Sequence, residues 1–517
     1  MRKSLWYKEA VIYEMYIDLF YDSNNDGIGD IQGLINKLVY IKELGVNCIW
    51  LLPIYKSPMK DGGYDISDYL SIRENLGNIS DFKRLVKKAH RMDIHIIIDM
   101  VMNHTSNTHY WFEASSNPKH KDFEKYKDYY LWNKNNKKYK ETKVLFTDLE
   151  KSNWTYSSSR KEYYFHRFYE FQPDLNWENK DVLKEFKDIL SFWMDLDIDG
   201  FRFDAVPYLY KEDGIDSENL PQTHRILKEM KSFISSYNRR NMIFLVEANT
   251  SMDNLIKYFG DGFNEANMAF NFTLQPRIFL SIATQNKLYI ENGIKRTLAI
   301  PYNTSWALFL RNHDELNLDM LNPTDLPLFF GLYGSEKLKF NNGISGRLAS
   351  LFKDNKHKII LAYGILLSLN GVPIIYMGDE LDTISDLKDT PRNVYYDARI
   401  IVRSKIDWNI ANKYIWDSNS TYNHIRDMLL IRKKYRKAFA FSDIAIVKSD
   451  SEGLLIYDRE YGKVKFMYIF NISDYDKSFH IKNLNINKFK VMFLSRVNID
   501  YSMINMLAYS FIWIKVL

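Results

Sequence analysis

The stretch that best indicates the fold is residues 199–206, Asp199-Gly200-Phe201-Arg202-Phe203-Asp204-Ala205-Val206. Side chains on a β-strand alternate between its two faces, so Arg202 and Asp204 point one way and Phe201 and Phe203 the other. A guanidinium beside a carboxyl group lowers the pKa of that aspartate and keeps it ionised, which suits a nucleophile. Taken alone, an Arg-x-Asp pair is more typical of a structural ion pair, and only the rest of the chain favours a nucleophile.

On both sides of this strand, short apolar runs alternate with segments of helical periodicity. Eight strand candidates are present, at residues 11–16, 46–52, 94–100, 200–206, 242–246, 268–272, 306–310 and 373–377. Helical spacing is clear at residues 31–44, before Gly45, and at residues 181–196 and 221–236. Eight strand–helix units over about 400 residues indicate a (β/α)8 TIM barrel rather than a doubly wound sheet.

Two parts of the chain break this rhythm. Residues 105–172 are polar, rich in lysine and tyrosine, and longer than an ordinary strand-to-helix loop. From residue 438 onward short alternating strands predict an antiparallel β-sandwich domain. We therefore expect a barrel formed by residues 1–104 and 173–437, an inserted domain at 105–172 after the third strand, and a C-terminal β-sandwich at 438–517.

Composition excludes several classes of protein. Lysine and arginine (70) nearly balance aspartate and glutamate (65), and the net charge of +5 predicts no nucleic-acid or membrane partner. The 15% aromatic content leaves rings to line a sugar pocket as well as a core. Cys48 is the only cysteine, and residues 1–16 lack the features of a signal peptide. We expect a cytoplasmic protein without an intrachain disulfide.

Polar side chains terminate several of the apolar runs. They are Asp99, Asn103, His104, Arg202, Asp204, Glu247, His313 and Asp314. In a barrel of this class the active site forms at the carboxyl ends of the strands, so these groups would converge on one mouth.

Three of these carboxyl groups suggest a reaction. The apolar strand before Glu247 would desolvate its carboxyl group and suit it to donate a proton, while Asp204 attacks as nucleophile. That pairing is the one used by retaining glycosidases. Asp314 would stabilise positive charge on the sugar ring. Taken singly, Glu247 could be a buried structural acid, Asp314 a helix cap and His104 an ordinary buried histidine, but their joint occurrence at strand ends favours a site.

Four segments resemble the signature regions of the α-amylase superfamily, glycoside hydrolase family 13. They are DMVMNH (99–104), GFRFDA (200–205), VEAN (246–249) and RNHD (311–314), with QPDLN (172–176) and GVPIIYMGDE (371–380) similar to two accessory regions. The resemblance covers residues 5–380, and it makes the insertion the family's domain B. It implies Asp204 as nucleophile, Glu247 as general acid/base and Asp314 as transition-state stabiliser, with sugar contacts from Arg202, His104 and His313.

Within the family, the chain is most similar to the subgroup that interconverts maltose and trehalose. The similar stretches are residues 218–224, 247–249, 259–262, 268–270 and 306–316. This implies intramolecular glucosyl transfer by double displacement through an Asp204 glycosyl-enzyme, with some side hydrolysis. An α-glucosidase acting on maltose or short α-glucosides is the alternative. A non-catalytic sugar-binding subunit is a further alternative, although it would have no need of three intact carboxyl groups.

The resemblance also implies sugar contacts outside the signature regions. DGGYD (61–65) resembles the pocket floor, where Tyr64 would stack on glucose and Asp61 would bind its hydroxyl groups; otherwise the stretch is a glycine turn with a buried tyrosine. Relatives carry an Arg-Thr-Pro-Met-Gln-Trp motif whose arginine binds the non-reducing glucose. Here residues 390–393 (TPRN) are only a short, partial match to that motif. Arg392 is the candidate to replace its arginine. A more open pocket would favour hydrolysis.

Two structural sites for Ca²⁺ or Mg²⁺ are expected, and no organic cofactor. The first is the loop 22–30 (DSNNDGIGD), with oxygen atoms at alternate positions from Asp22, Asn24, Asp26, Ile28 and Asp30. It is not an EF-hand, because Gly33 stands at the twelfth position, and its alternative is an Asx-rich turn. The second resembles a site under domain B, formed by Asn103, Asp174 and the carbonyl groups of Tyr208 and Leu209. Lys211 stands where the subgroup tends to carry an acid.

The expected partner is a small disaccharide, maltose or trehalose. A second copy of the chain and a maltose-using kinase are candidate protein partners that the sequence leaves undecided.

Overall fold

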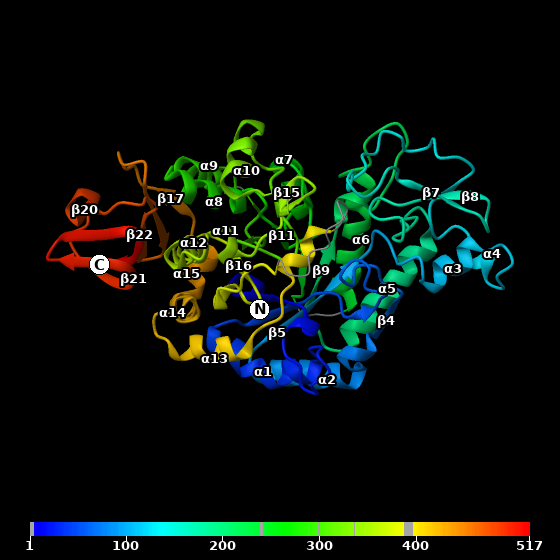
Figure 1. Cartoon of the computed structure of the whole chain (residues 1–517), viewed down its shortest axis with the longest axis horizontal. Coiled ribbons are helices and arrows are strands. Elements are labelled where there is room, and N and C mark those ends of the chain that lie inside the picture. The colour runs from blue at the N-terminus through cyan, green and yellow to red at the C-terminus, as the bar shows by residue number, and fades with distance from the viewer. Residues whose placement is uncertain (1–4, 238–240, 298–299, 336, 387–396) are drawn as a thin grey trace.

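A computed structural model describes residues 5–237, 241–297, 300–335, 337–386 and 397–517 (Figure 1). Eight parallel strands close into a barrel in the order β1-β16-β12-β11-β10-β9-β5-β2. They are β1 (Ile12–Met15), β2 (Cys48–Leu51), β5 (His95–Val101), β9 (Gly200–Asp204), β10 (Ile243–Val246), β11 (Met268–Phe270), β12 (Ser305–Phe309) and β16 (Val372–Tyr376). The predicted α/β barrel is confirmed, and each of its strands matches one of the apolar runs.

Helices cover the outside of the barrel and connect its strands. The longer ones are α1 (Ile31–Leu44), α2 (Ile79–Arg91), α5 (Lys180–Asp195), α6 (Pro221–Tyr237), α8 (Leu274–Thr284), α9 (Leu288–Arg296), α12 (Lys356–Ser368) and α14 (Thr421–Lys434). Local signals set their ends: Gly45 ends α1 with a left-handed φ of 104°, and Asn78 opens α2 with a capping box. No described helix is both long and apolar enough to cross a membrane.

The register of β9 with its neighbouring strands brings together several of the polar side chains found at the strand ends. Asp99 of β5 lies opposite Arg202, and Val101 lies opposite Asp204. On the other side Val246, directly before Glu247, lies opposite Phe203. Because parallel strands in register present neighbouring residues on the same face, Asp99, Arg202 and Glu247 meet at one edge of the barrel.

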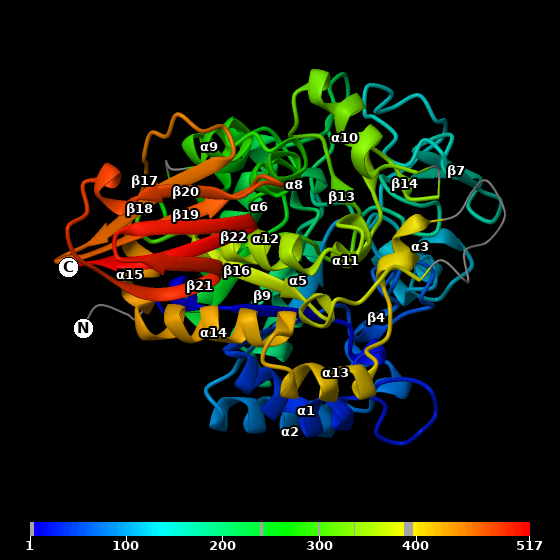
Figure 2. The same cartoon turned by 60° about the vertical axis from the view of Figure 1, so that its left-hand side comes forward.

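The chain between β5 and α5 forms a small unit beside the barrel mouth. It contains α3 (Tyr110–Ser116), α4 (Phe123–Tyr126) and an antiparallel sheet of β6 (Trp132–Asn133), β8 (Glu162–Phe165) and β7 (Trp154–Ser157). An isolated antiparallel bridge between His104 and Asp174 joins its two ends, and a second bridge joins Tyr130 to Leu175. Figures 1 and 2 show this unit and the C-terminal sheet at opposite ends of the barrel.

The C-terminal strands form one antiparallel sheet. They are β17 (Ile444–Ile446), β18 (Leu454–Tyr461), β19 (Val464–Asn471), β20 (Lys477–His480), β21 (Phe489–Asp500) and β22 (Met503–Val516). One face packs on α12, where Phe511 lies so close to Gly364 that an added Cβ would come within 2.5 Å of the ring. A second apolar cluster, including Ile456, Ile469 and Ile512, lies on the other face.

Candidate active site

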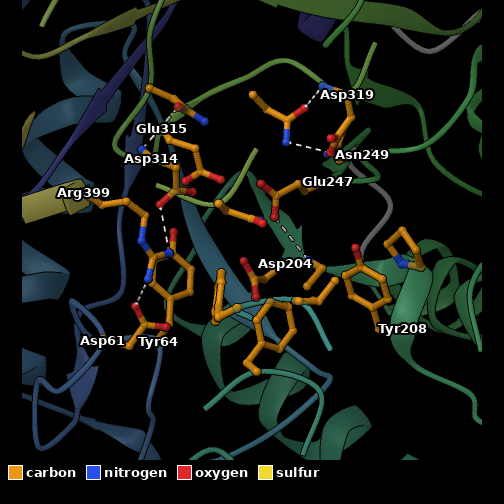
Figure 3. A pocket seen from close by; sticks show the side chains of 18 of the residues that line it. Asp61, Tyr64, Asp204, Tyr208, Glu247, Asn249, Asp314, Glu315, Asp319 and Arg399 are labelled. Atoms are coloured by element: carbon orange, nitrogen blue, oxygen red, sulfur yellow. Dashed lines mark hydrogen bonds and ion pairs between the residues drawn. The ribbon is translucent and has the colours of Figure 1, made fainter. Parts of the chain in front are cut away.

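A cavity opens at the carboxyl ends of the barrel strands (Figure 3). Its lining comes from the barrel, from the inserted segment and from the chain after β16. The lining residues are Asp61, Tyr64, His104, Leu145, Phe146, Phe168, Asp204, Ala205, Pro207, Tyr208, Glu247, Asn249, Phe272, Asn312, Asp314, Glu315, Asn317, Asp319, Asn341 and Arg399. Figure 3 shows Asp204, Glu247 and Asp314 around the same space.

Arg202 is the central cation of this site. Its guanidinium is 1% exposed and contacts three carboxyl groups: Asp99 at 2.5 Å, Asp204 at 2.6 Å and Glu247 at 2.6 Å. Nη1 contacts the two aspartates and Nη2 contacts the glutamate. The planar guanidinium therefore holds Asp204 and Glu247 close together. The Arg-x-Asp pair is thus part of a larger cluster rather than an isolated ion pair.

Burial changes the acidity of these carboxyl groups. It raises the pKa of Asp204 well above its usual value, and although Arg202 lowers that pKa, the charges of Glu247, Asp99 and Asp314 raise it further. Burial also raises the pKa of Asp99 to about 6, against the influence of Arg202. Arg202 does lower the pKa of Asp204, as expected, but the net shift is upward, because desolvation and three neighbouring carboxylates outweigh the guanidinium.

Glu247 is held from two sides. Besides Arg202, the backbone N–H of Ala205 donates to its Oε2 at 3.3 Å. Ala205 adopts a left-handed conformation with φ 48° and ψ 37°, a costly geometry for a residue with a Cβ. This turn aims the N–H at the glutamate directly after the strand that carries Asp204.

Asp314 contacts a histidine and two arginines. His313 Nε2 is 3.1 Å from its Oδ2, while Arg399 Nη1 and Arg403 Nη2 lie 3.3 and 3.2 Å from its Oδ1. Burial alone would raise the pKa of Asp314, but His313, Arg399, Arg403 and Arg202 together hold it well below its usual value. Asp314 is therefore a fixed negative charge at the cavity wall.

Glu14 was not predicted from the sequence. It lies on β1, fully buried, and its Oε1 accepts from the backbone N–H of His313 at 3.1 Å and lies 2.6 Å from His313 Nδ1. Burial raises the pKa of Glu14 well above its usual value. A single acid inside the apolar run at residues 11–16 was the available signal.

Asp61 and Tyr64 both line the cavity. The Tyr64 ring is 5.3 Å from the His313 ring at an interplanar angle of 9°, and its hydroxyl group lies 2.8 Å from His313 Nε2. Asp61 accepts from Gln172 Nε2 at 2.9 Å and from Arg399 Nη2 at 2.7 Å.

Arg399 lies beside Asp61 and Asp314, whereas Arg392, the arginine expected from the sequence to bind the sugar, lies outside the described residues. Figure 3 shows the Arg399 guanidinium between Asp61 and Asp314. Its side chain is 9% exposed, and Asp397 holds it with oxygen atoms 2.9 Å from Nε. Arg399 and Arg403 stand four residues apart in an apolar stretch, a pattern that could have singled them out.

His104 lines the cavity next to the inserted segment. Burial lowers its pKa to about 4, so the ring is neutral near pH 7. Its Nδ1 lies 3.3 Å from Asn103 Nδ2, and its Nε2 is buried.

The two predicted metal sites differ in how well their residues fit a cation. Loop 22–30 offers hard oxygen atoms, although Asp22 accepts from the N–H groups of Asn25 and Gly27, both at 2.7 Å. At the second site, Lys211 Nζ is 2.8 Å from Asn103 Oδ1 and 2.5 Å from Asp174 Oδ2. This second set does not fit a divalent cation, because an ammonium group already binds its oxygen atoms. Within the described ranges, no three His, Cys, Asp or Glu side chains are arranged to hold a metal ion.

Aromatic side chains form part of the cavity wall. Phe146 and Phe168 of the inserted segment lie 5.8 Å apart, and Phe146 also packs on Tyr169 at 4.8 Å. Glu315 lies beside Asp314 in the lining, where burial and the charge of Asp314 raise its pKa to about 8. Neither Phe146 nor Glu315 was predicted as a site residue.

Residues 14–319 match the model of the alpha-amylase catalytic domain. "Trehalose synthase/amylase TreS" of Mycolicibacterium smegmatis is 40% identical over 88% of this chain and 80% of its own length. "Trehalose synthase" of Thermus thermophilus is 36% identical over 92% of this chain, which spans only 51% of that longer relative.

Solved structures agree on the fold. The trehalose-6-phosphate hydrolase of Bacillus licheniformis superposes with a TM-score of 0.76 at 25% identity, covering 99% of both chains. The trehalulose synthase MutB of Pseudomonas mesoacidophila superposes with a TM-score of 0.81 at 23% identity over 99% of both chains. With its barrel, its strand-end carboxyl groups and these relatives, the chain is an enzyme of the α-amylase family.

Proposed function

We propose that this enzyme interconverts maltose and trehalose by intramolecular transfer of a glucosyl group. The observation that carries the retaining mechanism is the fork of Arg202, which binds Asp204 and Glu247 with its two terminal nitrogens, each at 2.6 Å. Retaining glycosidases keep their two carboxyl groups about 5–5.5 Å apart, whereas inverting ones leave room for a water at about 6.5–9.5 Å. A pair held by one guanidinium supports the shorter, retaining arrangement.

In the first step, an Asp204 oxygen attacks the anomeric carbon of the non-reducing glucose. The bond from that carbon to the glycosidic oxygen breaks, and Glu247 gives its proton to the departing O4 of the second glucose. Asp314 faces the positive charge that develops on the ring. The product is a glucosyl ester of Asp204 and one free glucose in the same cavity.

In the second step, the retained glucose turns and attacks through its 1-hydroxyl group. Glu247 takes the proton of that hydroxyl, the ester bond to Asp204 breaks, and an α,α-1,1 linkage forms. Attack by water in place of glucose would give hydrolysis. Isomerisation therefore requires the cavity to hold glucose and exclude water, for which the apolar wall of Leu145, Phe146 and Phe168 is suited.

The choice of substrate rests on the relatives that carry trehalose synthase in their names, at 36% and 40% identity over most of this chain. One of them is also named an amylase, and "Alpha-amylase 3" of Dictyoglomus thermophilum is 30% identical over 99% of this chain. Those names support some side hydrolysis. We also propose a structural Ca²⁺ at loop 22–30 and none at the Asn103–Asp174 position.

The test is to incubate the purified protein with maltose, beside an Asp204→Ala variant, and to resolve the sugars by chromatography. Trehalose as the main product, absent with the variant, is expected. Glucose alone would replace the proposal with an α-glucosidase, and no turnover of maltose or trehalose would refute it.

A further inference from the structure

Lys211 places an ammonium group between the barrel and the inserted segment. The residue follows the short helix η4 (Val206–Tyr208), which begins directly after β9 and Ala205. Its side chain is 1% exposed. Nζ lies 2.8 Å from Asn103 Oδ1 and 2.5 Å from Asp174 Oδ2, two oxygen atoms expected to bind a metal. A lysine this deeply buried needs a specific partner for its charge, and Asp174 supplies it.

The same position cannot also hold a divalent cation. Ca²⁺ takes six to eight oxygen ligands at about 2.3–2.6 Å, and Mg²⁺ needs near-ideal octahedral geometry. Here the two oxygen atoms are bound to an ammonium group, whose positive charge would repel a second cation at that distance. The only carboxylate of the set, Asp174, is neutralised by Lys211 itself.

The ammonium group joins segments that are far apart in sequence. Asn103 follows β5, whereas Asp174 ends the inserted segment, and the backbone N–H of Leu175 donates to the Asn103 carbonyl at 2.9 Å. Asp174 Oδ1 also accepts from the backbone N–H of Arg167 at 2.9 Å. A cation at this point therefore closes the base of the inserted segment, whose aromatic side chains wall the cavity.

Lys211 also determines which way the Asn103 amide faces. An ammonium group only donates hydrogen bonds, so the amide must turn its oxygen to Lys211 and its NH₂ group to His104 Nδ1, 3.3 Å away. Nδ1 then acts as acceptor, and the proton of the neutral ring lies on Nε2. That nitrogen is buried and belongs to a residue that lines the cavity.

We propose that Lys211 replaces a structural metal ion in this enzyme and, through Asn103, fixes His104 as a hydrogen-bond donor to the sugar. Lys211 is a positioning residue, since it touches no substrate itself. The effect on His104 rests on the proposed function, whereas the replacement of the metal does not.

The metal replacement is tested by counting ions in the wild type, Lys211→Met and Lys211→Glu. Calcium is titrated calorimetrically, and melting temperatures are measured with EDTA and with Ca²⁺. All three proteins share loop 22–30, so ions bound there cancel in the comparison. Lys211→Glu restores an acidic ligand and is expected to bind one more Ca²⁺ per chain than the wild type and to gain more in melting temperature. Lys211→Met should melt lower than the wild type and gain no ion.

Equal ion counts in the wild type and Lys211→Glu would overturn the metal replacement, as would an unchanged melting temperature in Lys211→Met. If Lys211→Glu does not fold with EDTA present, it is refolded with and without Ca²⁺. Rescue of folding by Ca²⁺ is then expected, and failure of Ca²⁺ to rescue it would also overturn the metal replacement.

The effect on His104 is tested with a double-mutant cycle of Lys211→Met and His104→Ala, read as kcat/KM for maltose below the melting temperature of the double variant. In the wild-type background, Lys211→Met should lower kcat/KM about tenfold or more. In the His104→Ala background, the same substitution should lower kcat/KM by less than about threefold. Lys211→Arg, which keeps the cation, should recover most of the activity. If the loss of kcat/KM in the double variant equals the product of the two single losses, Lys211 does not act through His104, and that part of the proposal is refuted. If the wild type does not turn over maltose, the proposed function fails. The Kd of glucose is then measured for the same four proteins, and the double-mutant cycle is evaluated from those values.

Discussion

Replacing Arg399 with alanine should disable the site, because this one side chain joins two of its carboxylates. Arg399 Nη2 donates to Asp61 at 2.7 Å and Nη1 to Asp314 at 3.3 Å. Hydrogen bonds to charged groups contribute about 1.5–3 kcal/mol each, but Arg403 still serves Asp314 in the variant. We therefore expect a loss of roughly 2–4 kcal/mol in transition-state stabilisation, which corresponds to a fall in kcat/KM of roughly 30- to 900-fold.

Stability should fall as well, because Asp61 and Asp397 would each lose a buried cationic partner. Arg399→Lys keeps the charge without the fork and should lie between alanine and the wild type.

The assay is the initial rate of maltose consumption at several substrate concentrations, with circular dichroism to confirm folding. Arg436→Ala removes a largely exposed ion pair with Glu9 and should stay near the wild type. A folded Arg399→Ala enzyme within about threefold of the wild type would refute this reasoning.

Three further predictions concern pH, product and metal. Burial raises the pKa of Glu315 to about 8, so its neutral form stabilises the fold below the unfolded pKa, and that stability is lost as pH rises through about 8. The melting temperature of Glu315→Gln relative to the wild type should therefore increase from pH 5 to pH 9; a constant difference would contradict the shift. Phe146→Ala opens the apolar wall and should raise the share of glucose among the products of maltose severalfold, while Phe263→Ala, at a 71% exposed position, should not. An unchanged share of glucose in Phe146→Ala would show that Phe146 does not help to exclude water. EDTA should lower the melting temperature of the wild type but not of Asp22→Ala, and an equal loss in both would place the cation outside loop 22–30.

The barrel could be predicted from the sequence because its strands are continuous apolar runs separated by helical spacing. The insertion and the C-terminal strands were visible as interruptions of that rhythm. The strand-end groups followed from topology alone, since residues such as Asp204 and Glu247 directly end or follow neighbouring strands.

Other features depend on distances that the sequence does not contain. Arg399 lies nearly two hundred residues after Asp204, and only the path of the chain after β16 brings it to Asp61 and Asp314. The pKa of Asp204 depends on its burial and on three other carboxylates, and neither the burial nor those separations can be read from residue order. Glu14 and Phe146 carry no motif, so their role at the site followed only from the folded chain.

The central claim is that Asp204 carries the glucosyl group between the two steps, and a trapped intermediate would test it directly. A Glu247→Gln variant, treated with 5-fluoro-α-D-glucosyl fluoride, should form the ester but break it down slowly. Intact mass should rise by one fluoroglucosyl group, and peptide mapping should locate that group on Asp204. A label on Asp314 or another carboxylate, or no adduct together with release of the β-anomer, would contradict the account.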